Sequence, residues 1–145
     1  MLFEEKVTEN KTAFLSKVEE ISRKLLIEPD WLMAVMYKES RLNHRAVNPN
    51  GGATGLIQFM PATAASLGTS TAALRNMSNV EQLNWVYLYY KPYRTKLDSY
   101  PDLYLATFFP AALGKSDDYV MQTSSLSART IARSNPAIDL NRDDK

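Results

Sequence analysis

Residues 31–63 read WLMAVMYKESRLNHRAVNPNGGATGLIQFMPAT and combine three features that are uncommon in an ordinary soluble sequence. A glutamate, Glu39, stands on the apolar side of a predicted helix. A glycine-rich loop follows, and a lone glutamine, Gln58, then stands among hydrophobic residues. The rest of the chain is typical of helices packed around this stretch, so we take residues 31–63 as the centre of the fold.

The helix that carries Glu39 is predicted over residues 29–41, because proline suits the first position of a helix. Helical spacing gives it one continuous stripe, which consists of Leu32, Val35, Met36 and Glu39. Glu39 therefore occupies a position where a core leucine is expected. A carboxyl group in apolar surroundings loses hydration, which raises its pKa, and a general acid needs such a pKa near neutral pH. The ordinary alternative is a helix glutamate that reaches solvent or pairs with Lys38 or Arg41.

The remaining sequence also predicts helices, at about residues 9–26, 61–67, 79–91, 103–109 and 127–134. Ser78 and Glu81 fit a capping box at the start of the helix predicted at residues 79–91. Its buried stripe is predicted to be Val80, Leu83, Tyr87 and Tyr90. No alternation typical of strands and no internal repeat is present. We expect an all-α domain over residues 1–135, with a loop or small hairpin at residues 46–58.

Residues 136–145 have a different composition and are interpreted as a polar tail. Asp139, Asn141 and Asp143 have the D-x-N-x-D spacing that begins a calcium loop. The sixth position of that loop is Asp144 rather than glycine, and the sequence stops before a twelfth-position glutamate. The alternative interpretation is therefore the edge of a truncated calcium-loop segment.

Composition excludes several classes of protein. The chain has 145 residues, of which 45% are hydrophobic, and this is enough for one domain with its own core. A net charge of +1 without a Lys/Arg run argues against a nucleic-acid partner. The absence of cysteine excludes a disulfide scaffold and a thiolate metal site. No apolar run reaches membrane-spanning length, and the first residues, MLFEEKVTENK, lack the apolar region of a signal peptide.

The single histidine, His44, argues against a Ser-His-Asp triad and against a multi-histidine metal site. Arg41 and Arg45 flank it, so the three residues form a small basic spot. Such a spot suits an anionic glycan or a peptide carboxylate, but the simpler interpretation is a solvated surface.

Other polar residues near Glu39 have two possible roles. Ser40 either bonds a substrate or the loop, or it bonds backbone as hydroxyls at helix ends do. The amide of Gln58, if buried, must satisfy its donors and acceptors. It therefore braces the loop or contacts the hydroxyl and acetamido groups of a sugar. Gly51, Gly52 and Gly55 give the loop its backbone freedom.

Aromatic residues are numerous in the second half of the chain, and most are expected in the core because of their helical spacing. Sugar rings stack on aromatic faces, so some aromatic side chains are expected to line a cleft. Tyr89 and Tyr93 lie off the predicted stripe and are better candidates for a cleft than Tyr87 and Tyr90.

The runs AVMYKES (34–40) and GATGLIQFMPATA (52–64) resemble the lytic transglycosylases of the lysozyme-like superfamily. That family has a helix ending in Glu-Ser, followed by a loop of the type G-A-x-G-L-M-Q-x-M-P-x-T-A. Glu39 and Ser40 match the first motif. The matches to the second motif are Gly52, Ala53, Gly55, Leu56, Gln58, Met60, Pro61, Thr63 and Ala64, with Ile57 in place of methionine.

One part of the family pattern is absent from this sequence. The family has a third motif, A-x-A-A-Y-N-A-G, and residues 104–112 here read YLATFFPAA. Phe108 and Phe109 therefore stand where the family has Tyr-Asn, so the family's tyrosine hydroxyl near the catalytic acid and its asparagine are missing from these positions. Tyr93 is a candidate to replace the hydroxyl.

The resemblance implies that peptidoglycan glycan strands are the partner and that the β-1,4 bond between N-acetylmuramic acid and N-acetylglucosamine is cut. Glu39 would act as the single general acid and base and leave 1,6-anhydro ends. No second carboxylate lies in the matching motifs, which favours one acid with assistance from the substrate. The expected protein is monomeric and needs no metal and no cofactor. The implied substrate-binding residues are Ser40, Gly55, Gln58, Met60, Tyr93 and Phe108.

Two alternatives stay open at this point. A hydrolytic lysozyme would cut the same bond with water, and a catalytically inactive module would bind glycan or serve as a structural part of a virion. Because no signal peptide is expected, a wall-cutting enzyme of this kind would be a phage virion component, an endolysin released at lysis, or a domain of a secreted protein. Phage origin is the favoured expectation.

Overall fold

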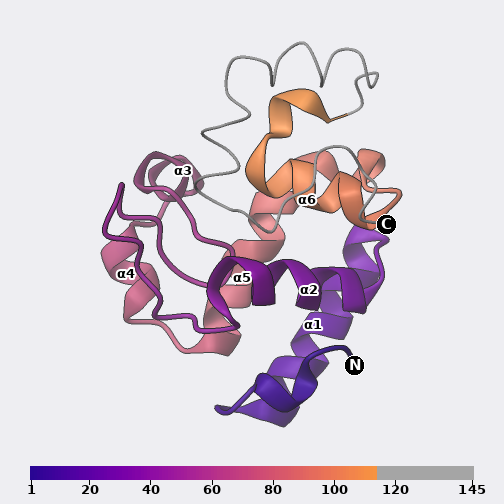
Figure 1. The fold of residues 1–145 in the computed structure, drawn as a ribbon, viewed down its shortest axis with the longest axis horizontal. Coiled ribbons are helices and arrows are strands. Elements are labelled where there is room, and N and C mark those ends of the chain that lie inside the picture. The colour runs from indigo at the N-terminus through magenta and orange to yellow at the C-terminus, as the bar shows by residue number, and fades with distance from the viewer. Residues whose placement is uncertain (114–145) are drawn as a thin grey trace.

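The fold is described here from a computed structural model, which describes residues 1–113. These residues contain α-helices and short 3-10 helices, with no named strand among them, so the all-α prediction is confirmed. The elements are η1 (Glu4–Lys6), α1 (Lys11–Leu25), α2 (Pro29–Ser40), α3 (Pro61–Leu67), α4 (Thr71–Arg75), α5 (Asn79–Tyr90), η2 (Lys91–Lys96), α6 (Tyr100–Phe108) and η3 (Pro110–Ala112) (Figure 1). The helix predicted at 127–134 and the tail at 136–145 lie outside the described residues.

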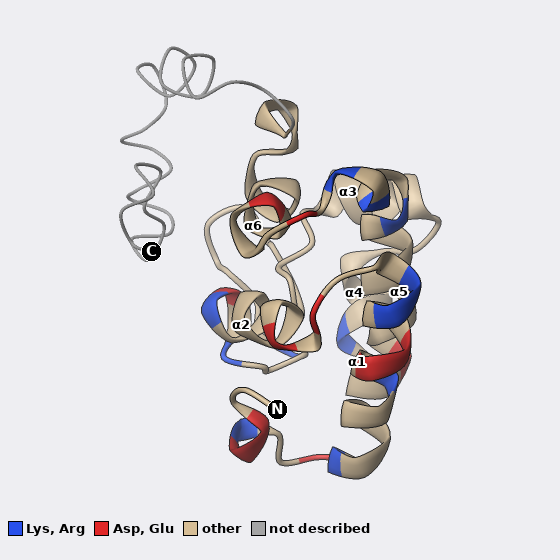
Figure 2. Ribbon diagram, turned by 90° about the vertical axis from the view of Figure 1, so that its right-hand side faces the viewer, with Lys and Arg blue, Asp and Glu red and all other residues tan. Residues whose placement is uncertain are grey.

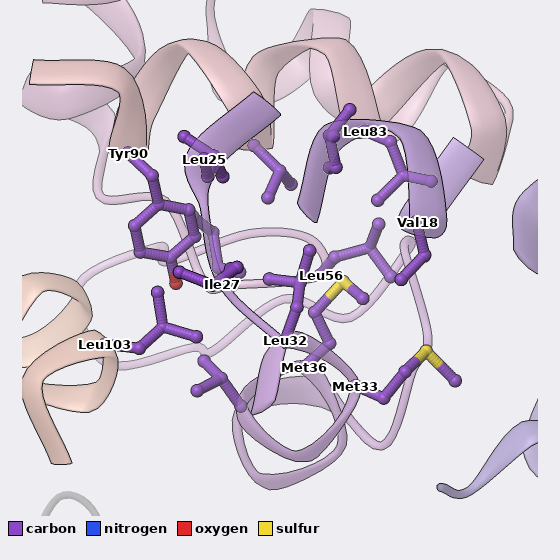
Figure 3. Close-up of a cluster of buried hydrophobic side chains, with 14 of the residues drawn as sticks. Val18, Leu25, Ile27, Leu32, Met33, Met36, Leu56, Leu83, Tyr90 and Leu103 are labelled. Atoms are coloured by element: carbon purple, nitrogen blue, oxygen red, sulfur yellow. The ribbon is translucent and has the colours of Figure 1, made fainter. Parts of the chain in front are cut away.

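Helices α1, α2, α5 and α6 surround one hydrophobic core. Helix α1 packs against both α5 and α2, and α6 packs against α2. Figure 3 shows how side chains from these helices meet, among them Leu25, Leu32, Leu83 and Leu103, which are all 0% exposed. Burial of each such side chain contributes on the order of 1.5–3 kcal/mol, so this cluster holds the helices together. Among the described residues, no helix is both long enough and apolar enough to span a membrane.

Charged residues lie on the outer faces of the helices. Figure 2 shows acidic and basic segments on α1, on α2 and in the short turn near the N-terminus. Lys24 and Glu20 form one exposed pair on α1, with 3.3 Å between Nζ and Oε2. Exposed pairs of this kind contribute little to stability, so packing of the core decides the fold.

Local sequence signals set the helix limits. Pro29 occupies the first turn of α2, and Gly68, at φ 97°, ends α3 in the left-handed conformation that glycine favours. The predicted capping box is confirmed, because the Ser78 and Glu81 side chains each accept the other residue's backbone N–H at 3.0 Å. Helix α5 ends at Tyr90, close to the predicted stop.

The predicted stripe on α5 is partly wrong. Leu83 and Tyr90 are buried as expected, but Val80 and Tyr87 are only half-buried. The buried face of the helix consists of Asn79, Gln82, Leu83, Val86 and Tyr90. This face includes two polar residues because α5 covers backbone of the neighbouring segments as well as apolar side chains.

His44 is buried, so its expected place on a solvated surface is wrong. Only 4% of the residue is exposed, and Nε2 has no hydrogen-bond partner within the described part of the chain. Residues 6–9 lie beside residues 41–45 and form a polar pocket of about 120 Å³, and Arg45 pairs with Glu9 at 2.9 Å. Burial lowers the pKa of His44, and the positive charge of Arg45 lowers that pKa further.

We predict that His44 makes the protein less stable in weak acid. The unfolded chain takes up a proton on this histidine below pH 6.5, whereas the folded protein resists protonation because its pKa is lower. The free energy of unfolding therefore falls as pH drops below 6.5, until the folded pKa is reached. Urea unfolding at about pH 7.5 and about pH 5 should show a smaller loss for His44→Gln than for the unchanged protein.

His44 is the one histidine of the chain, so the difference between the two proteins reports this residue together with its interaction with Glu9. Equal losses in the two proteins would contradict the prediction.

Candidate functional site

Glu39 lies in the last turn of α2 and is half-buried. The residues one and two turns before it on the same face, Leu32, Val35 and Met36, are 0% exposed. The carboxyl group thus stands at the edge of the core, as the helical spacing predicted. Arg41 and Leu42 follow with φ of 58° and 62°, which ends the helix and returns the chain toward it.

Ser40 connects α2 to the loop that follows. Its hydroxyl lies within hydrogen-bond distance of the carbonyl oxygens of Met36 (3.0 Å) and Leu56 (2.9 Å), which share its one proton, and the residue is 6% exposed. The structure therefore shows both the expected bond to the loop, through Leu56, and the bond to helix backbone that was the alternative, through Met36. Ser40 acts on the site by fixing residue 56 next to the end of the helix.

The loop at residues 46–59 has the form of a small irregular hairpin, as predicted. Thr54 makes isolated antiparallel bridges with both Val47 and Phe59. Thr54 and Phe59 exchange backbone hydrogen bonds of 2.9 and 2.8 Å, and Asn48 donates to the carbonyl of Ala53 at 2.8 Å. The loop thus has a defined shape without a regular strand.

Gln58 braces this loop. Its Nε2 donates to the carbonyl oxygens of Ala46 and Gly55, each at 3.2 Å. The residue adopts φ 58°, a conformation that non-glycine residues seldom adopt. Both amide hydrogens are used inside the loop, so Oε1 is the atom through which this half-buried side chain can accept a bond from a ligand.

Gln82 is a residue of the site that sequence reasoning missed. It is 0% exposed on α5, and its Oε1 accepts the backbone N–H of Leu56 at 2.6 Å. Its Nε2 donates to the carbonyls of His44 and Leu74, each at 3.0 Å. One side chain therefore holds both ends of the loop region against α5. The signal available in the sequence was its position three residues after Asn79, which places both polar residues on one face of the helix.

Gly55 is the point where the loop approaches Gln82 most closely. A Cβ atom at Gly55 would lie 2.5 Å from Oε1 and 2.9 Å from Cδ of Gln82. The backbone also has φ 89°, which favours glycine. Gly55 is buried, and its N–H donates to the carbonyl of Ala46 at 2.9 Å. Gly55 lies on the buried side of the loop, and its lack of a side chain lets the loop pack against Gln82.

Aromatic residues lie on both sides of this region. On one side, Tyr89 packs edge-on with Phe59 and at a tilt with Tyr93, with ring centroids 6.4 and 5.9 Å apart. On α6, Tyr104 contacts Phe108 at 6.1 Å, and Nζ of Lys38 lies 5.8 Å from the centroid of the Tyr104 ring. Tyr93 and Phe108, both predicted to bind substrate, are half-buried, and Met60 is 48% exposed.

The end of α6 is held by hydroxyl groups from α5. Tyr89 donates its hydroxyl to the carbonyl of Ala106 at 2.6 Å. This carbonyl cannot receive the usual helical bond, because residue 110 is a proline and has no N–H. Burial raises the pKa of Tyr89, and the neighbouring Tyr93 raises it further, so Tyr89 stays a neutral structural donor.

Thr107 and Tyr90 supply the polar contact next to Phe108 and Phe109. The Tyr90 hydroxyl bonds with Oγ1 of Thr107, and Oγ1 also donates to the carbonyl of Leu103 at 2.7 Å. Tyr90 is 0% exposed. Within residues 1–113, no cluster of three or more histidine or acidic side chains could hold a metal ion.

Comparison with known proteins gives one match. The family described as Transglycosylase SLT domain matches residues 16–89, which is about half of the 145 residues. The matched segment includes Glu39, the 46–59 loop and Gln82, and it ends before α6. Searches of curated proteins and of solved structures found no match.

We predict that Gly55→Ala destabilises the protein more than Gly68→Ala. Both glycines have positive φ, and an alanine there costs about 1–2 kcal/mol. A Cβ at Gly68 meets nothing within 4 Å, whereas a Cβ at Gly55 displaces the Gln82 amide. Loss of buried hydrogen bonds should add roughly 1–3 kcal/mol, measurable by urea unfolding.

Gly68→Ala is the matched control, because it reports the backbone strain alone. Equal destabilisation by the two variants would show that Gln82 moves aside without loss.

Proposed function

The chain belongs to the transglycosylase SLT domain family, and we propose that Glu39 is the single general acid and base of its reaction. At the level of the family, the activity is transglycosylase-type cleavage of glycosidic bonds in peptidoglycan, and the place of action is the bacterial cell wall. The finer proposal is that the MurNAc-GlcNAc β-1,4 bond is cut and that 1,6-anhydro-MurNAc ends are formed.

The position of Glu39 is the observation that carries this proposal. Glu39 is half-buried and lies one turn after the fully buried Val35 and Met36. Apolar surroundings favour the protonated form of a carboxyl group, which is the form that a general acid must have before reaction. Ser40 and Leu56 fix the 46–59 loop beside the same helix end, so a sugar held by that loop would meet this acid.

The proposed reaction needs one carboxyl group. Protonated Glu39 gives its proton to the bridging oxygen as the bond to C1 of the muramic acid breaks. The 2-acetamido oxygen of the substrate stabilises the positive charge that develops at C1. Glu39, now a carboxylate, takes the proton of the 6-hydroxyl, and that oxygen forms the new bond to C1.

Other carboxylates near the ends of helices have structural partners. Asp30 Oδ1 accepts the backbone N–H of Leu2 at 2.9 Å, and Asp102 Oδ2 accepts that of Asp98 at 3.0 Å. These contacts fix the carboxylates of Asp30 and Asp102 at the starts of α2 and α6. They support a reaction with a single acid in place of the more common carboxylate pair.

The proposed contacts to the glycan are Gln58, Met60, Tyr93 and Phe108. Gln58 offers Oε1 to a hydroxyl or acetamido N–H of the sugar, and the aromatic rings and Met60 offer apolar surface. Ser40 and Gly55 act through the loop that they position. We further propose that the protein works as a monomer and reaches the wall as a phage virion component or an endolysin.

Residues 108 and 109 favour a second candidate function, an inactive module that binds glycan. Two phenylalanines occupy the positions where the lytic transglycosylase motif has Tyr-Asn. A hydrolase that uses water in place of the 6-hydroxyl is the remaining alternative. The products separate the three: anhydro ends indicate a transglycosylase, reducing ends a hydrolase, and bound glycan without fragments a binding module.

We predict that Glu39→Gln lowers cleavage of purified peptidoglycan by about 10²–10⁴-fold, because an amide cannot donate the proton. Mass spectrometry of the soluble fragments should show anhydro ends for the unchanged protein. Glu28→Gln, an exposed position at the start of α2, is the matched control and should keep full activity. Retained turnover by Glu39→Gln would refute the proposed role of Glu39.

A further inference from the structure

The pocket beside His44 contains a buried polar atom that the described residues leave unpaired. His44 is 4% exposed, and its Nε2 has no hydrogen-bond partner within residues 1–113. A buried nitrogen without a partner costs free energy, so native proteins supply one from the chain, from water or from a ligand. The pocket that His44 lines has a volume of about 120 Å³, which is room for a group larger than one water molecule.

Positive charge predominates in the walls of this pocket. Lys6, Arg41 and Arg45 line it, and Glu9 is the one acidic residue among the lining residues. Glu9 pairs with Arg45 at 2.9 Å, so the charges of Lys6 and Arg41 are in excess. Cζ of Arg41 lies 4.8 Å from the centroid of the Tyr37 ring. Stacking on a ring uses the face of the guanidinium and leaves the N–H groups in its plane able to donate to an anion.

The wall formed by residues 6–9 is fixed at both ends. This segment leads into α1 below α2 in Figure 2. Before it, the Phe3 ring stacks on the Tyr37 ring, with 4.2 Å between centroids and 12° between planes. At its end, Nδ2 of the buried Asn79 donates to the carbonyl of Glu9 at 2.8 Å. The pocket therefore has its shape before a ligand binds, which lowers the cost of binding.

This pocket is separate from the region that faces Glu39. Tyr37 precedes Glu39 by two residues, and two residues of a helix turn by about 200°. The Tyr37 ring, with Arg41 stacked on it, therefore lies on the other side of α2 from the Glu39 carboxyl group. The wall at residues 6–9 also precedes residue 16, where the match to the transglycosylase SLT domain begins. The family match therefore does not account for this pocket.

We propose that this pocket binds a carboxylate group, either the C-terminal end of a peptide or a small organic acid. One carboxylate oxygen accepts from Nε2 of His44, and both oxygens suit the planar N–H groups of Arg41. Glu9 borders the pocket and repels anions, so a ligand with one negative charge is favoured over a phosphate with two. This inference goes beyond the proposed function, because no step of it involves Glu39.

The single histidine allows a direct test by NMR. The ring signals of His44 are unambiguous in the spectrum of the full chain, because no other histidine is present. Sodium acetate and N-acetyl-alanyl-alanine are titrated separately at constant ionic strength. We expect a saturable shift of the His44 signals, with half-saturation on the order of 1 mM for the better ligand. Tighter binding of the dipeptide identifies a peptide end as the source, and equal binding identifies small organic acids.

The titration of His44 gives a second measurement. Burial, and then the positive charge of Arg45, lower the pKa of His44, while Glu9 raises it. Lys6 and Arg41 are the other charged residues that line the pocket. A bound carboxylate stabilises the imidazolium form, so saturating ligand should raise the midpoint of the His44 signals by about 0.5–1 pH unit. Binding should accordingly tighten as pH falls from about 7.5 to about 5.5.

Two variants connect the binding to the walls of the pocket. Lys6→Gln and Arg41→Gln each remove one positive charge and should weaken binding about tenfold. Arg23→Gln is the matched control, because Arg23 is exposed in the last turn of α1. It makes the same change in net charge about 20 Å along the helix from the pocket, and should leave the affinity unchanged. Urea unfolding checks that each variant is folded.

Several results would overturn the inference. His44 signals that do not move, or a midpoint that stays in place, would mean that water alone fills the pocket. A shift that rises without saturation to about 100 mM would be a general effect of ions. Equal weakening by Arg23→Gln and Lys6→Gln would assign the effect to net charge, and tighter binding of the N-acetyl-alanyl-alanine methylamide or of inorganic phosphate would exclude a carboxylate site. Activity or inactivity of Glu39→Gln changes none of these results, so this inference and the proposed function fail separately.

Discussion

The buried amide of Gln82 is the contact on which the site depends. It accepts the N–H of Leu56 and donates to the carbonyls of His44 and Leu74, and these backbone groups are otherwise shut away from water. A buried group left without its partner costs about 1–3 kcal/mol, so three such bonds outweigh most single contacts of the loop. Gly55 belongs to the same arrangement, because only a residue without a side chain fits against this amide.

Helix α5 organises both sides of the region around Glu39. Gln82, in its second turn, holds the loop, and Tyr89 and Tyr90, at its end, hold the last turn of α6. Tyr89 compensates for the N–H that Pro110 lacks, while Tyr90 bonds with Thr107. Because both attachments come from one rigid helix, the loop and α6 keep a fixed relation to each other. Preorganisation of this kind is what a site for general acid catalysis needs.

Membership of the transglycosylase SLT domain family gives the class of reaction, and the proposed role of Glu39 is compatible with it. The family gives the class of reaction and the substrate, and the helix face gives the half-buried carboxyl group. Phe108 and Phe109 replace the Tyr-Asn pair of the lytic transglycosylase pattern, but α6 still carries a hydroxyl group beside them. The hydroxyl pair beside them comes from Thr107 and from a tyrosine on another helix.

The sequence by itself determined the all-α class, most helix limits and the place of Glu39 on an apolar face, because caps, prolines and helical spacing act within a few residues. The paired motifs were also sufficient to indicate the family. The roles of Gln82, Tyr90 and His44 were decided only by the tertiary structure. Gln82 bonds to residues 26 and 38 positions away, and Tyr90 to one 17 positions away. Local patterns carry no information about such distant partners, because folding alone brings them together.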